Sequence, residues 1–219
     1  MSHYTINDDK IRTKIILVIW MISFIAALIL YKKIGGLWES MNSWLSKSDT
    51  GRTIVLFDII PNLISVPVIY AILFFLHDKL LWKNRLIMKL HGIPDLNGEW
   101  KGELVSSFCE NKKFDMTIIV KQTWTQMSMI AKYDMSRSSS KNITIKSDGA
   151  VTKIYFGFTN ESKDVNNLDM YFGYNEITLE EEEVDDKKIQ IMEGKYCNNR
   201  KSPRQKGGNV GVFRLKKVS

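Results

Sequence analysis

The sequence has few of the side chains that most enzyme active sites need. Its three histidines are His3, His77 and His91, so residues 92–219 contain no general base or metal ligand of this type. It also lacks a phosphate-binding glycine loop, a CxxC pair and a nucleophile elbow. We therefore expect no enzymatic activity, and hence no catalytic residue, no metal site and no cofactor.

Cysteine is scarce as well. Only Cys109 and Cys197 occur, which excludes the disulfide framework of a small secreted module. The two could meet across a sheet, but the favoured interpretation is a pair of buried, reduced thiols. The acidic run EEEEVDD at residues 180–186 lacks the spaced glycine and ligand spacing of a calcium loop, and it is typical of a solvated turn.

Long apolar runs are abundant, and nearly all of them lie within residues 1–89. Residues 15–31, IILVIWMISFIAALILY, carry no charge. At about 1.5 Å per residue this run would span about 26 Å as a helix, close to the ~30 Å hydrocarbon core of a bilayer. Basic residues precede it as in a signal peptide, but no small-residue cleavage site follows. The run therefore predicts a membrane-spanning helix after an N-terminal segment at residues 1–14.

A second apolar run, residues 53–76, is also long enough to span a bilayer. It contains Asp58, and because a carboxylate at mid-bilayer costs about 2.5–3.5 kcal/mol, we place this residue near one interface. Asn62 shares its helical face and either caps the helix in water or contacts the first helix. There, Ser23 and Ala27 would offer a surface of small residues. The sequence thus predicts a transmembrane hairpin.

Basic residues set the expected orientation of this hairpin, which covers residues 15–76. Seven lysines and arginines flank its outer ends, against four in the connection at residues 32–52. We therefore expect a multi-pass membrane protein with both ends in the cytoplasm. A linker at residues 77–93 would join the hairpin to a cytoplasmic domain at residues 94–219.

This C-terminal domain reads as about eight short strands, rich in β-branched and aromatic residues and separated by turn signals. Such spacing is typical of an antiparallel barrel or sandwich, and eight strands can close a barrel that holds one small ligand. The start Gly98-Glu99-Trp100 resembles the first strand of lipocalin-like barrels, where the tryptophan closes one end and an arginine of the last strand packs across it. We therefore interpret Trp100 and Arg214 as structural residues of an eight-stranded antiparallel lipocalin-like barrel.

The best candidate for ligand binding is the segment GKYCNNR. Strand alternation places Tyr196, Asn198 and Arg200 on one face, and Arg204 follows in a basic turn. Two arginines can form charge-assisted hydrogen bonds to phosphate oxygens. The alternative is a solvated basic terminus near anionic lipid headgroups, since residues 195–219 hold eight lysines and arginines and no acidic residue.

A second candidate patch lies on the earlier strands. Gln122 and Trp124 end a predicted strand, and Ser138 and Ser140 follow in MSRSSS. A tryptophan face can stack on a nucleobase for about 1–3 kcal/mol, while serine and glutamine can hydrogen-bond to the edge of the base. The aromatic residues Tyr155 and Tyr171 are similar candidates. For all the aromatic residues, packing in the barrel core is the alternative.

The order of modules resembles a known family. Two apolar runs, a linker, PDLNGEWKG and then GKYxxxR and GxFRLKK are similar to the SMODS-associated two-transmembrane β-strand-rich effectors of bacterial cyclic-oligonucleotide antiphage signalling (CBASS). The resemblance covers nearly the full chain. Tyr196 and Arg200 match a Gly-x-Tyr-x-x-x-Arg signature, whereas Asn198 stands where a threonine is expected and KSPRQKGG lengthens the last hairpin. The resemblance also matches Gln122, Trp124, Ser138 and Ser140 to a polar and aromatic wall of the site.

The resemblance implies a function. The barrel would bind a cyclic dinucleotide made by a partner nucleotidyltransferase, and the helices would then form a homo-oligomer that disrupts the inner membrane and kills the infected cell. The expected partners are the cyclic dinucleotide and inner-membrane lipids, with no DNA or RNA. Two alternatives remain open: a membrane-tethered lipocalin-like carrier of a lipid or other hydrophobe, and an anchored barrel that binds protein.

Overall fold

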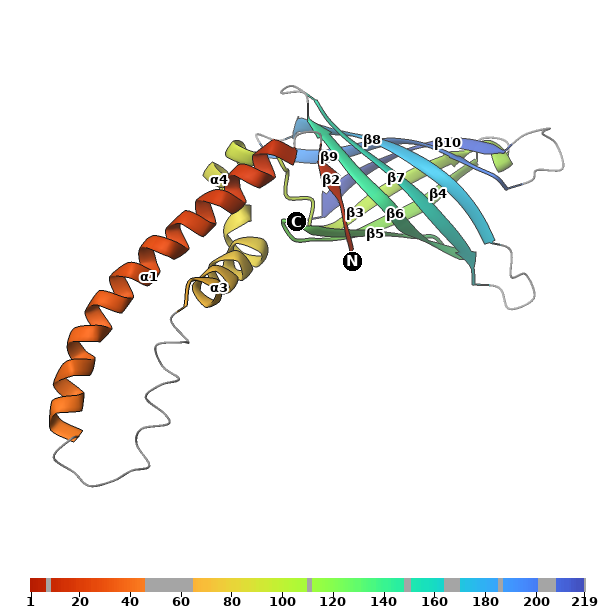
Figure 1. Cartoon of the computed structure of the whole chain (residues 1–219). Coiled ribbons are helices and arrows are strands. Elements are labelled where there is room, and N and C mark those ends of the chain that lie inside the picture. Colours follow the sequence, from red (N-terminus) through yellow and green to blue (C-terminus); the bar gives the residue numbers. More distant parts are fainter. Residues whose placement is uncertain are drawn as a thin grey trace. The chain divides into compact units, whose positions relative to one another are not determined.

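The computed structural model (Figure 1) describes residues 1–6, 9–45, 65–109, 112–147, 151–163, 170–184, 187–200 and 208–218. The chain divides into two compact units. One combines Met1–Asp9 with Lys83–Ser219, and the other is Lys10–Trp82. The extreme N-terminus therefore belongs to the C-terminal domain, which the sequence did not lead us to expect.

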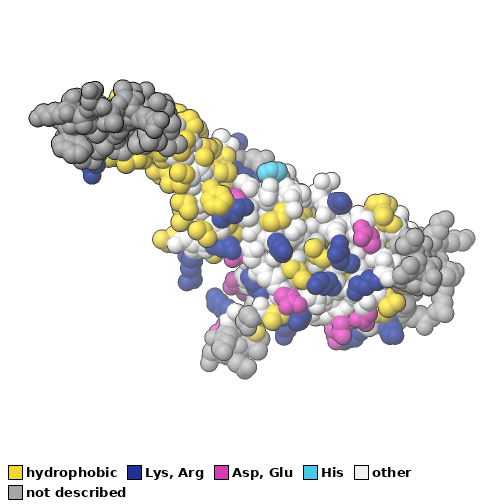
Figure 2. All heavy atoms as spheres, turned by 90° about the horizontal axis from the view of Figure 1, so that it is seen from below, with side chains coloured by type: hydrophobic (Ala, Val, Ile, Leu, Met, Phe, Trp, Pro, Cys, Tyr) yellow, Lys and Arg dark blue, Asp and Glu magenta, His cyan; other side chains and the backbone are white. Residues whose placement is uncertain are grey.

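Among the described residues of the helical unit, one helix is a candidate membrane span. Helix α1 (Asp9–Leu45) includes the span Lys10–Lys33, 24 residues that contain an 18-residue window with a mean hydropathy of 2.5. Its apolar side chains are largely exposed, among them Leu17 and Met21. Figure 2 shows apolar side chains, in yellow, gathered on the surface of the helical part. Exposed apolar residues on a helix of this length suit contact with lipid.

The predicted two-helix hairpin is not shown. Helix α3 (Val66–Lys79) has 14 residues, fewer than the roughly 20 that a span needs, and no second candidate span is found among the residues described. The first half of the second run, with Asp58 and Asn62, lies outside the described residues.

Two connecting segments differ from expectation because they are helical. The predicted connection at residues 32–52 continues α1 as far as Leu45, since it lacks proline and two glycines cost only about 1 kcal/mol each. The predicted linker contains the last turn of α3, a 3₁₀ turn η1 (Leu81–Lys83) and helix α4 (Arg85–His91). Asn84 caps α4 by accepting a hydrogen bond from Leu86 N at 3.0 Å, and Gly92 ends it with φ of 65°.

One face of α1 is buried. Ile15, Ile19, Ser23 and Ala27 recur every four residues, and each is at most 9% exposed. The Ser23 hydroxyl donates to the Ile19 carbonyl at 2.7 Å, so it needs no other partner. The structure thus places the two predicted contact residues, Ser23 and Ala27, on a buried face, and their role in helix association stays a prediction.

The C-terminal domain is an eight-stranded antiparallel β-barrel, as predicted. Each strand pairs with its neighbours in the chain, and the last strand returns to the first. The strands are β3 (Gly98–Ser106), β4 (Lys112–Gln122), β5 (Gln126–Lys132), β6 (Ser136–Ser147), β7 (Thr152–Ser162), β8 (Met170–Val184), β9 (Lys187–Asn198) and β10 (Asn209–Val218), with a 3₁₀ turn η2 (Ser107–Cys109) after β3.

The barrel closes through a short seam between β5 and β6. These strands pair directly only at Ile130–Lys132 against Arg137–Ser139. Where they diverge, strands β1 (Ser2–His3) and β2 (Thr5–Ile6) lie along them, β1 antiparallel to β5 and β2 parallel to β6. Residues 2–6, which we call the N-terminal strap, therefore complete the sheet at the seam.

One end of the barrel is closed by packed side chains. Trp100 is fully buried, and its indole Nε1 donates to the Leu96 carbonyl at 2.9 Å. The prediction that Arg214 packs across Trp100 is wrong, because Arg214 faces outward and pairs with Glu182 and Glu193. Lys217 takes its place, with Nζ 5.5 Å from the centre of the Trp100 ring, because alternate residues of β10 face inward and 217 has the inward parity that 214 lacks.

The thiol of Cys197 also differs from expectation. It is free and exposed on β9, rather than buried. Its inward-facing neighbours on that strand, Tyr196 and Asn198, line the barrel interior instead.

Candidate ligand-binding site

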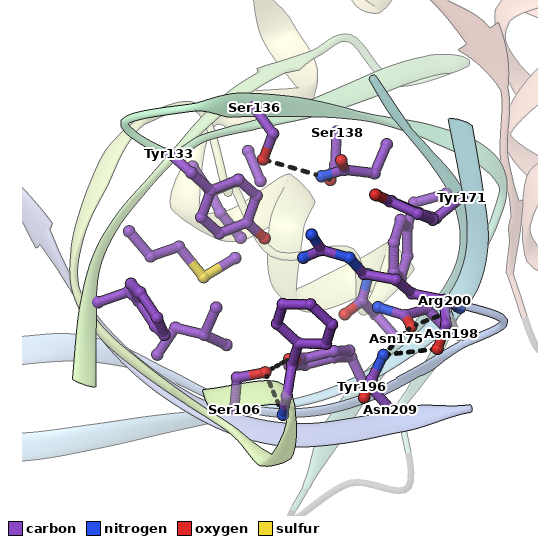
Figure 3. A pocket seen from close by; sticks show the side chains of 18 of the residues that line it. Ser106, Tyr133, Ser136, Ser138, Tyr171, Asn175, Tyr196, Asn198, Arg200 and Asn209 are labelled. Carbon is purple, nitrogen blue, oxygen red and sulfur yellow. Dashed lines mark hydrogen bonds between the residues drawn. The ribbon is translucent and has the colours of Figure 1, made fainter. Parts of the chain in front are cut away.

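The end of the barrel opposite Trp100 holds a cavity of about 290 Å³ (Figure 3). It is built from the C-terminal ends of β3, β5, β7 and β9 and the N-terminal parts of their partners. Its apolar wall includes Leu104, Phe114, Met116, Ile118, Met129, Ala131, Phe156 and Phe158. Its polar groups include Ser106, Tyr133, Ser138, Ser140, Asn160, Tyr171, Asn175, Tyr196, Asn198, Arg200 and Asn209.

Arg200 provides a cation at the cavity. The centre of its guanidinium lies 3.6 Å from the centre of the Phe108 ring and 4.8 Å from that of Tyr171. Its backbone is fixed as well, because its N–H donates to Asn198 Oδ1 at 3.1 Å and its carbonyl accepts from Asn209 Nδ2 at 2.6 Å. No carboxylate among the described residues pairs with it. A guanidinium held between two rings keeps its N–H groups available at its edge for an anion.

Tyr196 is held in place beside this cation. Its hydroxyl donates to Ser106 Oγ at 2.7 Å, and its ring meets Phe158 edge-on, with centroids 6.5 Å apart. Two glycines make room for these rings. A Cβ at Gly211 would lie 2.3 Å from the Tyr196 ring, and one at Gly173 would lie 2.3 Å from the Phe158 ring. The aromatic pair is therefore set by backbone that only glycine allows.

Hydroxyl groups form the opposite wall. Asn160 Nδ2 donates to Ser138 Oγ at 2.8 Å, and Ser140 Oγ accepts from the Met129 N–H at 2.9 Å. Burial raises the pKa of the Tyr133 hydroxyl, which also hydrogen-bonds to Ser138. Tyr133 therefore stays protonated at neutral pH and keeps a donor in the cavity.

The chemistry of this cavity fits an anion that also carries flat, polar groups. A guanidinium can bind phosphate, aromatic rings can stack on bases, and amides and hydroxyls can bind base edges. The family model described as Cap15, cyclic dinucleotide receptor domain, matches residues 91–217, which is more than half of the chain.

The chain belongs to the Cap15 cyclic dinucleotide receptor family.

The Cap15 match confirms the coarser part of the predicted function, a CBASS effector that senses a cyclic dinucleotide through its barrel. The family describes a receptor domain, which is a sensor rather than a catalytic module. No curated protein matches the chain closely enough to count as a relative. The matched range ends one residue before β10 does, so the Cap15 domain is the barrel described above.

The Cap15 cavity brings together six of the ten predicted ligand residues. These are Ser138, Ser140, Tyr171, Tyr196, Asn198 and Arg200. Arg204 lies outside the described residues. The remaining three, Gln122, Trp124 and Tyr155, do not line the cavity.

Gln122 and Trp124 lie at the closed end of the Cap15 barrel. Gln122 Oε1 accepts from the Leu96 N–H at 2.9 Å, and its Nε2 donates to the Pro94 carbonyl at 3.1 Å. The Trp124 carbonyl accepts from the Tyr4 hydroxyl at 2.8 Å. Gln122 has the inward parity of the cavity residues on β4, but it comes at the other end of the strand, and alternation alone cannot tell the two ends apart.

Tyr155 has the outward parity on β7. Its neighbours Ile154 and Phe156 are buried, whereas its own ring stacks on Tyr174 outside the barrel, with centroids 6.4 Å apart. Inward-facing and outward-facing residues alternate along this strand, and this alternation could have excluded Tyr155 from the barrel interior.

Several cavity residues were not found from the sequence. Among them are Ser106, Phe108, Tyr133, Asn160, Asn175 and Asn209. Asn175 could have been found from Tyr171, because residues of equal parity on one strand face the same side. Phe108 and Tyr133 lie just beyond strand ends, where alternation gives no information.

Proposed function

We propose that this chain is a membrane effector that binds a cyclic dinucleotide in the cavity and, once bound, oligomerises through its helices and disrupts the inner membrane. The observation that carries the binding step is Arg200, whose guanidinium is fixed between Phe108 and Tyr171 without a carboxylate partner among the described residues. A cation positioned this way suits one phosphate of the ligand. Arg204 remains the predicted partner of the other phosphate. No further cofactor is proposed.

The same cavity provides for the bases. Tyr196 and Phe158 offer aromatic surface near Arg200, and the amides and hydroxyls offer hydrogen-bond partners. One charge-assisted contact contributes about 1.5–3 kcal/mol and each stacked base about 1–3 kcal/mol. Together these contributions can exceed the cost of ordering the ligand.

The membrane steps rest on α1. Its apolar, exposed stretch Lys10–Lys33 suits a span of the inner membrane, and its buried face with Ser23 and Ala27 suits close helix packing. The proposal includes a second span over residues 53–76 and a cytoplasmic barrel, so that a soluble signal reaches the cavity. Inner-membrane lipids are then the second partner.

The decisive experiment is calorimetric titration of the full chain in lipid nanodiscs with a panel of cyclic dinucleotides. We expect saturable binding of at least one of them and a loss of about 10- to 100-fold in affinity for Arg200→Ala, the loss of one charge-assisted contact. Arg214→Ala is the matched control, because this arginine lies outside the barrel and pairs with glutamates. Equal affinities for the two variants would overturn the site assignment.

The membrane step has its own test. Full chain in liposomes loaded with a self-quenched dye should release the dye only after the bound dinucleotide is added, and crosslinking should show oligomers at the same concentration. Leakage that is independent of the dinucleotide, or binding without leakage, would contradict the effector mechanism while leaving the receptor role in place.

A lipid carrier is the second candidate, and the apolar wall of the cavity favours it. Leu104, Met116 and Ile118 would suit an acyl chain. This function predicts lipid that co-purifies with the chain, occupies the cavity and is unaffected by Arg200→Ala. Finding such lipid together with no binding across the dinucleotide panel would replace the effector proposal.

A further inference from the structure

Asn175 has a buried side-chain amide that makes no hydrogen bond to the described part of the protein. It lies on β8 between Phe156 of β7 and Tyr196 of β9, its cross-strand neighbours, and it is 7% exposed. Its side chain lines the cavity and is seen there in Figure 3. Within the described part of the chain, no group hydrogen-bonds to its amide.

Each of the other amides at the cavity makes at least one hydrogen bond within the protein, although the buried Oδ1 of Asn209 accepts none among the described residues. Asn160 donates to Ser138, Asn198 Oδ1 accepts from the Arg200 N–H, and Asn209 donates to the Arg200 carbonyl. Burying an amide without a hydrogen bond is unfavourable, so a buried unpaired amide that faces a cavity is suited to a ligand. The burial of Asn175 thus marks a ligand contact that the guanidinium and the aromatic rings do not supply.

The chemistry of an amide narrows the choice of ligand. It presents a donor beside an acceptor, which pairs with N6 and the neighbouring ring nitrogen of adenine, and also with O6 and N1–H of guanine or O4 and N3–H of uracil. A carboxylate, which has two acceptors, instead suits the N1–H and N2–H donors of guanine. The two carboxylates that line the cavity, Asp115 and Asp134, are exposed rather than buried with Asn175.

We propose that Asn175 hydrogen-bonds to the edge of one base of the bound cyclic dinucleotide. Its amide oxygen accepts from a donor of the base, its amide nitrogen donates to the adjacent acceptor, and Phe156 and Tyr196 flank the base. This inference rests on the proposed function, because it assumes that a cyclic dinucleotide occupies the cavity.

The test compares affinities of the full chain in nanodiscs for cyclic di-AMP, cyclic di-GMP and cyclic di-UMP. Asn175→Asp replaces the amide donor by an acceptor, so it should weaken cyclic di-AMP about 10- to 100-fold relative to cyclic di-GMP, the discrimination of one bidentate pair. Asn175→Ala should weaken cyclic di-AMP without strengthening cyclic di-GMP.

Asn142→Asp is the matched control, because it adds the same charge at an exposed position where φ is 49° and aspartate is tolerated. It should change none of the affinities. An Asn175→Asp variant that shifts all three ligands equally, or an Asn175→Ala variant that binds every ligand like wild type, would overturn the base contact yet leave the receptor function standing. Absence of binding to every ligand would instead count against the proposed function itself.

A separate observation concerns the N-terminal strap, residues 2–6. Tyr4 is 1% exposed, and its hydroxyl donates to the Trp124 carbonyl, while the hydroxyls of Thr5 and Thr144 lie 2.8 Å apart. The strap therefore adheres to both strands of the seam, and helix α1 begins at Asp9, shortly after the strap ends.

The cavity touches the same seam from inside. Next to the directly paired residues Ile130 and Ser139, the Ser140 hydroxyl accepts from the Met129 N–H and joins β6 to β5. Ser140 also lines the cavity, and its hydroxyl proton can be donated to a ligand oxygen. Hydrogen bonds in series strengthen one another, so a ligand that accepts from Ser140 tightens the link between β5 and β6.

We infer that the seam couples the cavity to α1. Ligand binding strengthens the pairing of the strap with β5 and β6, and this restrains the chain at the point where α1 begins. Hydrogen exchange of the full chain in nanodiscs, with and without saturating cyclic di-AMP or whichever panel member binds, tests this. Exchange of residues 2–6 should slow about fivefold or more on ligand binding, a typical coupling between two sites. Ser140→Ala should abolish the slowing, while Ser147→Ala, at the far end of β6, should not.

Thermodynamic reciprocity provides a second readout. Loosening the strap with Tyr4→Ala should weaken ligand affinity by the factor by which the ligand protects the strap. Thr5→Val, a milder change that removes only the hydroxyl next to Thr144, should act in the same direction with a smaller effect. Unchanged exchange of residues 2–6 at saturation, or wild-type affinity in both strap variants, would overturn the coupling.

Discussion

The two ends of the barrel contain the same kinds of side chain but use them differently. At the closed end, Trp100 and Gln122 direct their polar atoms to backbone groups of residues 94–97, and Lys217 donates to the Asp95 carbonyl. At the open end, no described carboxylate pairs with Arg200, and no described group hydrogen-bonds to the amide of Asn175. Residue type therefore does not identify a site in this fold, whereas unsatisfied polar groups at a cavity do.

The largest expected effect comes from removing the buried Trp100 side chain at the closed end. Trp100→Ala should lower the free energy of unfolding of the barrel by about 3–5 kcal/mol, because a fully buried indole is replaced by a cavity. Urea unfolding of the full chain in micelles measures this. Trp20→Ala, on the exposed apolar surface of α1, is the tryptophan control and should leave barrel unfolding unchanged. A stable Trp100→Ala barrel with weakened ligand binding would mean that the two ends are not separate in function.

Gln122 tests whether hydrogen bonds, rather than volume, hold the closed end. Gln122→Met keeps the size of the side chain but leaves the Leu96 N–H and the Pro94 carbonyl without their partners. Stability should fall by about 2–3 kcal/mol, since each unsatisfied buried group costs about 1–3 kcal/mol. Ligand affinity should stay within twofold of wild type. A loss of affinity without a loss of stability would return Gln122 to the binding site that the sequence predicted.

The errors of the sequence prediction follow the same division between ends. Turn signals and strand composition were enough to predict eight antiparallel strands, and alternation correctly grouped Tyr196, Asn198 and Arg200. Alternation gives the face of a strand but not the position along it, so Gln122 was assigned to the wrong end. The register of β10 against β3 sets Lys217, not Arg214, beside Trp100, and register depends on pairing that no local pattern reveals.

The N-terminal strap was missed for a different reason. Its two strands have only two residues each, too short for an alternating pattern to be recognised. Its place in the sheet depends on contacts with residues more than 100 positions away, such as the hydrogen bond from Tyr4 to Trp124. Long-range pairing of this kind is visible only in the folded chain.

At the open end, Tyr196→Phe separates the ring from its hydroxyl. The ring keeps its place against Phe158 and Gly211, while the hydrogen bond to Ser106 is lost. We expect ligand affinity to fall about fivefold, the value of about 1 kcal/mol for one hydrogen bond, with barrel stability nearly unchanged. Calorimetry and urea unfolding of the same preparation measure both. Ser106→Ala should reproduce the loss if the hydroxyl acts by orienting the ring, and wild-type affinity in both variants would exclude that role.

The smallest effect concerns the charge of Lys217 at the closed end. Burial lowers the pKa of its ammonium below the ordinary value of 10.5, although the nearby Asp95 partly offsets this. Between the folded-state pKa and 10.5 the unfolded chain binds more protons than the folded one, so stability rises with pH in that window and this contribution is constant above it. Lys217→Met should remove the rise, whereas Lys216→Met, at the exposed neighbouring position, should keep it. Thermal unfolding of wild type and Lys217→Met is measured from about pH 7 to above 10.5, and the difference between their melting temperatures should change with pH. A difference that stays constant would mean that this lysine is hydrated at the closed end rather than buried over Trp100.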